Sequence, residues 1–255
     1  MGGVTGTYLI TGATGGIGTA VAELLRERGH DLVLTGRSPD RLAELAGKLR
    51  TGAAHAATQS IAIAPGGPPA AASGASITTV PLDLTEPRRI EAVLAGAELP
   101  DRLDGVVHAA GVVHLSPVAE LEADEWMDHL SVNLVSAAEV TRLLLPALRA
   151  AEGHVVFVNS TAGLRANPEW SAYAASKFGL RALADSLRAE EPSLRVTTVY
   201  PGRTATEMQR RVRAQEGHPY AEDDFAAPGT VARVLVAALE TPRDAVVSDV
   251  TVRPN

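Results

Sequence analysis

Tyr173 and Lys177 stand four residues apart in the segment 171–177 (SAYAASK). In a helix this spacing places both side chains on one face, one turn apart. A unit charge about 4 Å away offers roughly the 4 kcal/mol needed to bring a tyrosine pKa of about 10 toward 7. The pair therefore predicts a side chain that can donate and accept a proton, although the same spacing is also common on ordinary helices.

The composition limits the classes of protein to which the chain can belong. Its 255 residues are 45% apolar and 21% charged, which suits one large α/β domain or two small ones. The net charge of −7 argues against a nucleic-acid or membrane partner. Because there is no cysteine, disulfides, thiolate catalysis and cysteine ligands are excluded, and we expect no metal site. Residues 1–7 lack the pattern of a secretory leader, so we expect a cytoplasmic protein.

A glycine-rich turn follows the first apolar run. Residues 8–10 predict a buried strand, residues 11–18 read TGATGGIG, and residues 19–28 predict a helix that stops at Gly29. Glycines let the backbone approach a pyrophosphate, and the N-terminus of a helix offers it free N–H groups. The simpler alternative is a tight turn without a ligand. The candidate cofactor-binding residues here are Gly12, Thr14, Gly15, Gly16, Ile17 and Gly18.

The end of the second strand bears on the choice of cofactor. Residues 31–35 predict this strand, and Gly36 and Arg37 follow it where an acidic residue would bind the ribose 2′-hydroxyl of NAD. An arginine at this place accommodates a 2′-phosphate instead. The sequence therefore predicts NADP(H) in preference to NAD(H), the alternative being that Arg37 is a solvated loop residue.

Residues 51–75 differ in composition from the rest of the chain. A helix is predicted from Pro39 to about residue 50, and then alanine, glycine and proline dominate with little charge. Such a density of glycine and proline opposes regular structure. We expect a flexible surface insertion without a function of its own.

Further strands and helices alternate along the chain. Strands are expected at 77–82, 105–108, 155–158, 196–199 and 249–252, and helices at about 86–95, 124–150 with a kink near Pro146, 171–190, 203–215 and 227–240. This alternation predicts an α/β fold: a Rossmann-like, doubly wound parallel sheet of about seven strands with helices on both faces. We expect residues 1–255 to form a single NAD(P)-binding domain.

Ligands of such sheets bind beyond the carboxyl ends of the strands. Asp83 follows the third strand and could cap the next segment or contact a cofactor base. Asn133, inside an apolar helix, could form a hydrogen bond between helices, and His108 favours a structural role. The remaining cofactor-binding candidates near strand ends are Asp83, Leu84, Ala109, Ala110, Gly111, Pro201, Gly202, Thr204 and Thr206.

These motifs together resemble the short-chain dehydrogenase/reductase family. Thr11-Gly12-x-x-x-Gly16-x-Gly18 is similar to its cofactor turn, 109–111 to its Asn-Asn-Ala-Gly element, and Pro201-Gly202 with Thr206 to the element that closes over the nicotinamide. His108 stands where the family often has asparagine. The glycines also fit the spacing of an epimerase-like branch, but only about fifty residues follow Gly202, too few for that branch's C-terminal domain. The resemblance favours the single-domain branch.

The resemblance also implies catalytic roles, for Asn133, Ser160, Tyr173 and Lys177. Tyr173 would donate or accept the proton at the substrate oxygen, and Ser160 would hydrogen-bond that oxygen. Both Tyr173 and Lys177 are also expected to bind the cofactor. Lys177 would hold the nicotinamide ribose and stabilise the phenolate. Asn133 would support a water that connects Lys177 to solvent. The implied activity is an NADP-dependent interconversion of a carbonyl and an alcohol.

Two alternative functions remain on the same fold: an NADP(H)-sensing regulator and a sugar-nucleotide epimerase or dehydratase. The partner is expected to be a small carbonyl or alcohol substrate, in a pocket whose candidate residues are His114, Leu115, Leu164, Trp170, Met208 and Tyr220. The resemblance implies a homodimer or homotetramer formed through the helices that contain Asn133 and Tyr173. The leucines at 143–145 and 148 would suit that contact or packing on the sheet.

Overall fold

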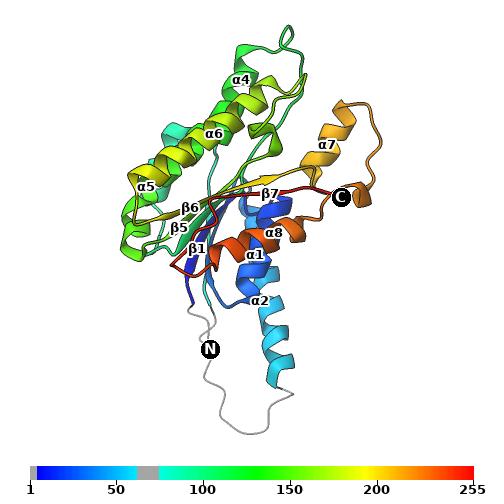
Figure 1. The fold of residues 1–255 in the computed structure, drawn as a ribbon. Coiled ribbons are helices and arrows are strands. Elements are labelled where there is room, and N and C mark those ends of the chain that lie inside the picture. The colour runs from blue at the N-terminus through cyan, green and yellow to red at the C-terminus, as the bar shows by residue number, and fades with distance from the viewer. Residues whose placement is uncertain (1–4, 62–74) are drawn as a thin grey trace.

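Seven parallel strands form one sheet in the computed structural model, which describes residues 5–61 and 75–255 (Figure 1). The strand order is β3-β2-β1-β4-β5-β6-β7, so the chain winds outward from β1 in one direction and then, from β4, in the other. This is the doubly wound sheet predicted from the sequence. The strands are β1 (Thr7–Thr11), β2 (Asp31–Gly36), β3 (Ile77–Pro81), β4 (Gly105–His108), β5 (His154–Val158), β6 (Arg195–Pro201) and β7 (Asp249–Val252).

Helices cover both faces of the sheet (Figure 1). One layer is built of α1 (Gly16–Glu27), α2 (Pro39–Ile61) and α8 (Pro228–Leu239). The opposite layer holds α3 (Ile90–Ala95), α4 (Ala123–Leu130), α5 (Ser136–Ala151) and α6 (Ser171–Glu190). Helix α7 (Glu207–Gln215) stands apart from both layers. Short turns complete the path: η1 (Pro87–Arg89), η2 (Ser131–Val135), η3 (Thr161–Gly163) and η4 (Glu222–Asp224).

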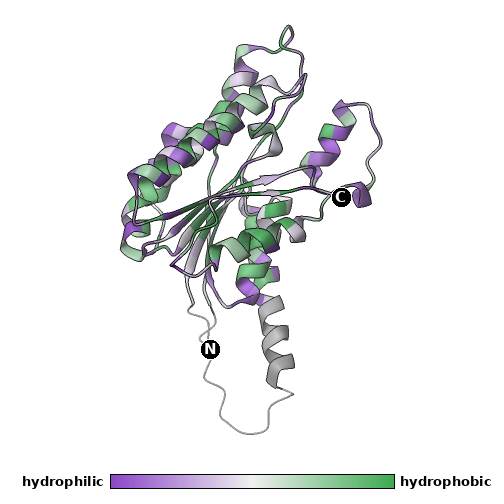
Figure 2. Ribbon diagram, in the orientation of Figure 1, coloured by the Kyte–Doolittle hydropathy of each residue, from purple (hydrophilic) through white to green (hydrophobic). Residues whose placement is uncertain are grey.

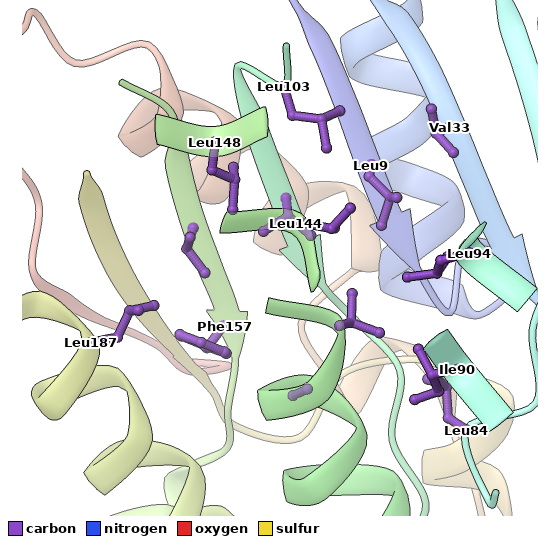
Figure 3. Close-up of a cluster of buried hydrophobic side chains, with 14 of the residues drawn as sticks. Leu9, Val33, Leu84, Ile90, Leu94, Leu103, Leu144, Leu148, Phe157 and Leu187 are labelled. Atoms are coloured by element: carbon purple, nitrogen blue, oxygen red, sulfur yellow. The ribbon is translucent and has the colours of Figure 1, made fainter. Parts of the chain in front are cut away.

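Each face of the sheet has its own apolar core, because successive side chains of a strand point to opposite sides. Leu9 and Val106 belong to the core beneath α3, α5 and α6, part of which Figure 3 shows. Their neighbours Ile10 and Val107 belong to the core beneath α1, α2 and α8. Figure 2 shows the matching hydrophobic runs in α1 and α8. The strands are therefore apolar on both faces, as parallel strands between two helical layers must be.

Helix α2 corrects one boundary predicted from the sequence. It continues to Ile61, so the predicted end near residue 50 was wrong. The residues between 50 and Ile61 include several alanines, the strongest helix formers, and glycine and proline become dense only after Ile61. The rest of the predicted insertion, 62–74, lies outside the described residues.

The long helical segment that was expected to kink near Pro146 changes its geometry elsewhere. Pro146 lies inside α5, which continues to Ala151. The irregular turn is η2, a widened π-type turn between α4 and α5. It contains Asn133, whose side chain is buried. A break near Pro146 is therefore ruled out, and the irregular turn lies about three helical turns before it.

The run Ala123–Ala151 contains an 18-residue stretch with a mean hydropathy of 1.2, and by length and composition it could cross a membrane. Core helices of globular proteins meet the same criterion. Leu144 and Leu148 of this run are buried in the core beneath α5, with Leu143 and Leu145 packed against it. Of the two interpretations of this leucine stripe, the structure supports packing on the sheet.

Candidate active site

A cleft of about 180 Å³ opens beyond the carboxyl ends of the central strands. In a doubly wound sheet this is the edge where the connections from neighbouring strands part to opposite faces. Half of the lining consists of predicted catalytic or cofactor-binding residues: Ile17, Ala109, Ala110, Gly111, Ser160, Tyr173, Lys177, Pro201, Gly202, Thr204 and Thr206. The fold thus brings segments from four separate parts of the chain into one cleft.

Tyr173 and Lys177 occupy one face of α6, as their spacing predicts. Their side chains are 7% and 3% exposed. The Lys177 ammonium lies 5.8 Å from the centre of the Tyr173 ring and donates a hydrogen bond to the Val158 carbonyl, at 3.1 Å. Ser160, two residues after the end of β5, faces the Tyr173 hydroxyl closely enough to influence its pKa. The three polar groups are held together in a largely dry environment.

Burial dominates the protonation of this pair. It raises the pKa of Tyr173 above its ordinary value, and the hydrogen-bonding influence of Ser160 only opposes that rise. Burial also lowers the pKa of Lys177 to about 8. The expectation that the Lys177 charge would bring the pKa of Tyr173 toward 7 is therefore wrong for the protein alone. Desolvation by burial is the larger of the two influences on the Tyr173 pKa, and the Lys177 charge is not one of them.

Asn159 is a site residue that the sequence analysis missed. Its side-chain oxygen accepts a hydrogen bond from the Ser160 backbone at 2.8 Å, and its amide nitrogen donates to the Lys177 carbonyl at 3.0 Å. One buried side chain thereby fixes the end of β5 against the middle of α6. The only signal in the sequence is its place at the end of an apolar run, which does not reveal either partner.

Asn133 joins three segments rather than lining the cleft. It exchanges two hydrogen bonds with the backbone of Val112, at 2.8 and 2.9 Å. Its amide also donates to the Ser176 hydroxyl at 3.0 Å, and that hydroxyl donates to the Tyr173 carbonyl. The interpretation that Asn133 forms a hydrogen bond between helical segments is thus confirmed. The same side chain holds the segment after Gly111 beside α6.

The glycine turn packs too tightly for other residues. Gly12 has a φ of 63°, and a Cβ there would lie 2.6 Å from the Ala110 Cα. A Cβ on Gly18 would lie 2.2 Å from the Gly12 carbonyl oxygen. Gly15 caps α1 without any side-chain hydrogen bond, so the first N–H groups of the helix face outward without a side-chain partner. This arrangement fits a dinucleotide phosphate, whose oxygens accept such hydrogen bonds.

Beside this turn lie the groups expected to meet the rest of a dinucleotide. Arg37 is exposed at the end of β2. A hydrogen bond from the Thr85 backbone, at 3.0 Å, holds the pKa of the Asp83 carboxyl below its usual range, with a smaller contribution from Arg37. Asp83 therefore closes a local turn with Thr85, while the next helical turn, η1, begins after Glu86 without a side-chain capping hydrogen bond. The sequence analysis missed Arg41, which donates to the Thr14 carbonyl at 2.7 Å. Leu84 packs into the core.

The predicted substrate-pocket residues divide into two groups. Trp170 and Met208 line the cleft. The other four, His114, Leu115, Leu164 and Tyr220, are not part of its lining. The sequence analysis missed Gln209 and Val212, which also line it and stand on α7. Position along α7 decides which residues face the cleft, and that orientation was not available from the sequence.

Comparison with known proteins agrees with this geometry. A model of the short chain dehydrogenase family matches residues 7–65 and 69–217, and the chain belongs to this family of oxidoreductases. It is 31% identical over 254 residues to glycine betaine reductase ATRR of Emericella nidulans, covering 96% of this chain but only 18% of that protein. It is 28% identical to an uncharacterized oxidoreductase of Listeria innocua, Lin0452, covering 96% and 95% of the two chains.

A solved structure of similar fold is the alcohol dehydrogenase of the archaeon Thermococcus sibiricus, complexed with 5-hydroxy-NADP. The two share 24% sequence identity and superimpose with a TM-score of 0.82, over 98% of this chain and 97% of that one. At this identity the likeness concerns the fold, and it extends over the whole seven-stranded sheet with its helices.

The packing of the glycine turn leads to a test of stability. We expect Gly12→Ala to lower the free energy of unfolding by about 2 to 4 kcal/mol, because it combines left-handed strain with a backbone clash. Gly47→Ala is the matched control, since a Cβ there meets nothing within 4 Å and α2 favours alanine. The control should gain about 0.5 to 1 kcal/mol in urea unfolding. Equal stability of both variants would contradict the close approach.

Proposed function

We propose that the protein is an NADP-dependent oxidoreductase that interconverts a carbonyl and an alcohol. The observation that carries the proposal is the gathering of Ser160, Tyr173 and Lys177 in one cleft with the segments at 109–111 and 201–206. A polar set of this kind, in a concave site next to a glycine turn, is what hydride transfer to a carbonyl requires of a protein. The chain is proposed to act as one NAD(P)-binding domain.

Each polar side chain has a separate task in this proposal. NADP(H), held by the glycine turn and by Lys177, supplies the hydride chemistry. Ser160 donates a hydrogen bond to the substrate oxygen, where negative charge develops. Tyr173 gives that oxygen its proton in reduction and takes it back in oxidation; its raised pKa keeps it protonated before reduction. Asn133 supports the water that connects Lys177 to solvent.

The preference for NADP(H) is proposed from the end of β2. Gly36 leaves no carboxylate there to bind a ribose 2′-hydroxyl, and Arg37 stands exposed beside it. A guanidinium can hold a 2′-phosphate through charge-assisted hydrogen bonds. The neighbouring Asp83 carboxylate accepts two hydrogen bonds from Thr85, and within the part of the chain that the structure describes Arg37 forms no ion pair.

The proton-transfer role is tested by removing one hydroxyl. We expect Tyr173→Phe to lower NADPH-dependent turnover of aldehydes and ketones by about a hundredfold to ten-thousandfold, with NADPH affinity close to wild type. Tyr220→Phe is the control, because Tyr220 is outside the cleft lining and stacks on Phe225. Turnover in a panel of carbonyl compounds and fluorescence titration with NADPH measure the two effects. Retained turnover in Tyr173→Phe would refute the role.

The cofactor preference is tested at Arg37. We expect Arg37→Ala to weaken NADPH binding about tenfold to a hundredfold while NADH binding changes little, because only NADPH carries the 2′-phosphate. Arg233→Ala, an exposed arginine on α8, is the matched control. Titration of each variant with both nucleotides provides the measurement. An equal loss for NADH, or no loss at all, would contradict the assignment.

We also propose that the chain forms a homodimer or homotetramer through the helices that contain Asn133 and Tyr173. Met127, Val135 and Phe178 expose apolar surface on α4, η2 and α6. Light scattering should give two or four times the mass of the chain. Phe178→Glu should reduce this mass, whereas Val246→Glu, at an exposed valine outside these helices, should not. A monomeric wild type would contradict the proposal.

A further inference from the structure

Gln209 is a buried polar side chain in the wall of the cleft that the proposed reaction does not use. It lies on α7 and is only 7% exposed. Its amide nitrogen is shielded from solvent and has no hydrogen-bond partner among the described residues. An amide donor buried without an acceptor destabilises the protein, so a group that satisfies it here gains binding energy. Trp170, Met208 and Val212, which also line the cleft, offer no such acceptor.

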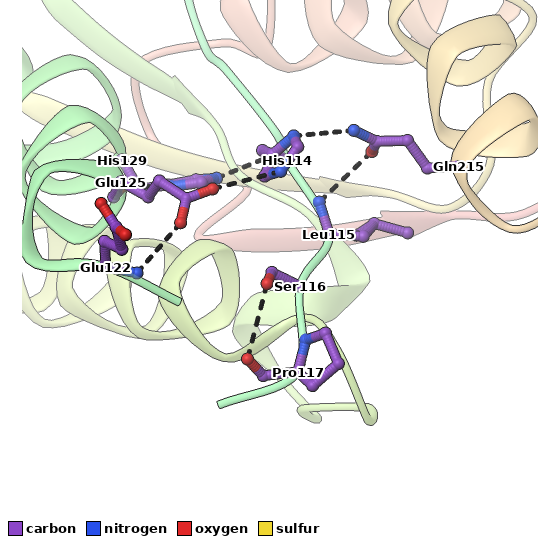
Figure 4. A network of polar contacts seen from close by, with 8 residues as sticks. All are labelled: His114, Leu115, Ser116, Pro117, Glu122, Glu125, His129 and Gln215. Carbon is purple, nitrogen blue, oxygen red and sulfur yellow. Dashed lines mark hydrogen bonds and ion pairs between the residues drawn. The ribbon is translucent and has the colours of Figure 1, made fainter. Parts of the chain in front are cut away.

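The position of Gln209 is fixed because α7 is fastened at both ends. Thr206 caps its beginning, accepting a hydrogen bond from the Gln209 backbone at 3.2 Å. At its end, the Gln215 amide contacts the His114 ring at 2.7 Å and accepts from the Leu115 backbone at 3.2 Å (Figure 4). The donor therefore belongs to a helix that is held over the cleft before any ligand enters.

The loop that receives Gln215 is itself anchored to α4. The His114 ring lies 3.1 Å from the Glu125 carboxylate, and the His114 backbone donates to the His129 ring at 3.0 Å (Figure 4). The buried His129 ring in turn lies edge-on to Tyr173, with 6.4 Å between ring centres. One set of contacts thus connects α7, the loop and the helix that packs beside Tyr173.

Charge in this part of the cleft favours an uncharged ligand. Arg203 lines the cleft, but its guanidinium forms two hydrogen bonds with the Glu216 carboxylate, at 2.8 and 2.6 Å. Arg203 and, more weakly, Arg213 hold the pKa of Glu216 below its usual range, so the carboxylate stays ionised and both guanidiniums are paired with it. Val113, Met208 and Val212 add apolar surface. Of the two cations among the described lining residues, Arg203 is thus paired, and Lys177 stands beside Tyr173 on α6 and not on α7 with Gln209. A carboxylate that contacts Gln209 therefore meets no lining cation on the same helix.

We infer that Gln209 determines specificity by donating a hydrogen bond to a second, uncharged oxygen of the substrate. The inference rests on the proposed reductase function and narrows its substrate class to neutral aldehydes or ketones that carry a further ester, ketone or hydroxyl oxygen. The terminal amide torsion of glutamine is broad, so the donor can turn into the cleft when that oxygen enters. A substrate without the oxygen leaves the donor unpaired and is disfavoured.

The test compares ketones in pairs, with NADPH as the reductant. Each pair consists of a keto ester, such as ethyl acetoacetate or ethyl levulinate, and the plain ketone of equal chain length. In the plain ketone two methylene groups replace the C(=O)–O unit of the ester. The variants are Gln209→Met, which keeps the length but removes the amide, and Arg211→Ala, an exposed control on the same helix. NADPH affinity and thermal unfolding are measured for each variant to confirm an intact fold.

We expect wild type and Arg211→Ala to prefer one keto ester over its plain partner by about tenfold to a hundredfold in kcat/KM. Gln209→Met should lose most of this preference through slower turnover of the ester alone, and NADPH binding should be unchanged. Turnover without preference in wild type, or a preference that survives Gln209→Met, would overturn the inference and leave the reductase function standing. Failure to consume any ketone, with NADPH bound, would instead overturn the proposed function and the inference with it.

Discussion

The divergence of the chain after β1 and β4 is the constraint on which the site depends. The two strands are paired, yet the segments that leave their carboxyl ends turn to opposite faces of the sheet. A cleft must open between them, and at its bottom the backbone segments that follow the two strands lie in close contact. Gly12 therefore rests on Ala110 with no room for a Cβ. The same narrowness brings α6 from one side and α7 from the other over a single opening.

Burial is the second determinant, and it acts on the catalytic candidates and on specificity alike. It raises the pKa of Tyr173 and lowers that of Lys177, so both groups favour their neutral forms more than they would in water. The same shielding from solvent leaves the Gln209 amide nitrogen without a hydrogen-bond partner among the described residues. In such a site each polar contact made by a substrate counts for more than it would at the surface, because no solvent competes for the donor. The proposed proton transfer and the proposed substrate specificity thus both depend on burial of the polar side chains.

The sequence predicted what depends on local pattern. β4 and β7 agree with their expected bounds because glycine or polar residues delimit short apolar runs, and α6 follows from its spacing. The prediction failed where two local signals compete, as in α2, whose alanines favour a helix while the low charge suggests a loop. It failed also where tertiary contacts decide: Lys177, which binds the Asn159 amide, is distant from it in sequence, and η2 carries no breaker residue.

His108 shows how one departure from the family pattern is accommodated. It stands where the resembling family often has asparagine, at the end of the strand that leads into 109–111. Here its ring hydrogen-bonds to the Thr141 hydroxyl of α5 at 2.9 Å and stacks on Phe157, with 5.0 Å between ring centres. Burial lowers its pKa to about 3, so the ring is neutral at physiological pH and carries one N–H group. The His108 imidazole thus connects β4 to α5 through a hydrogen bond that does not require asparagine at this position.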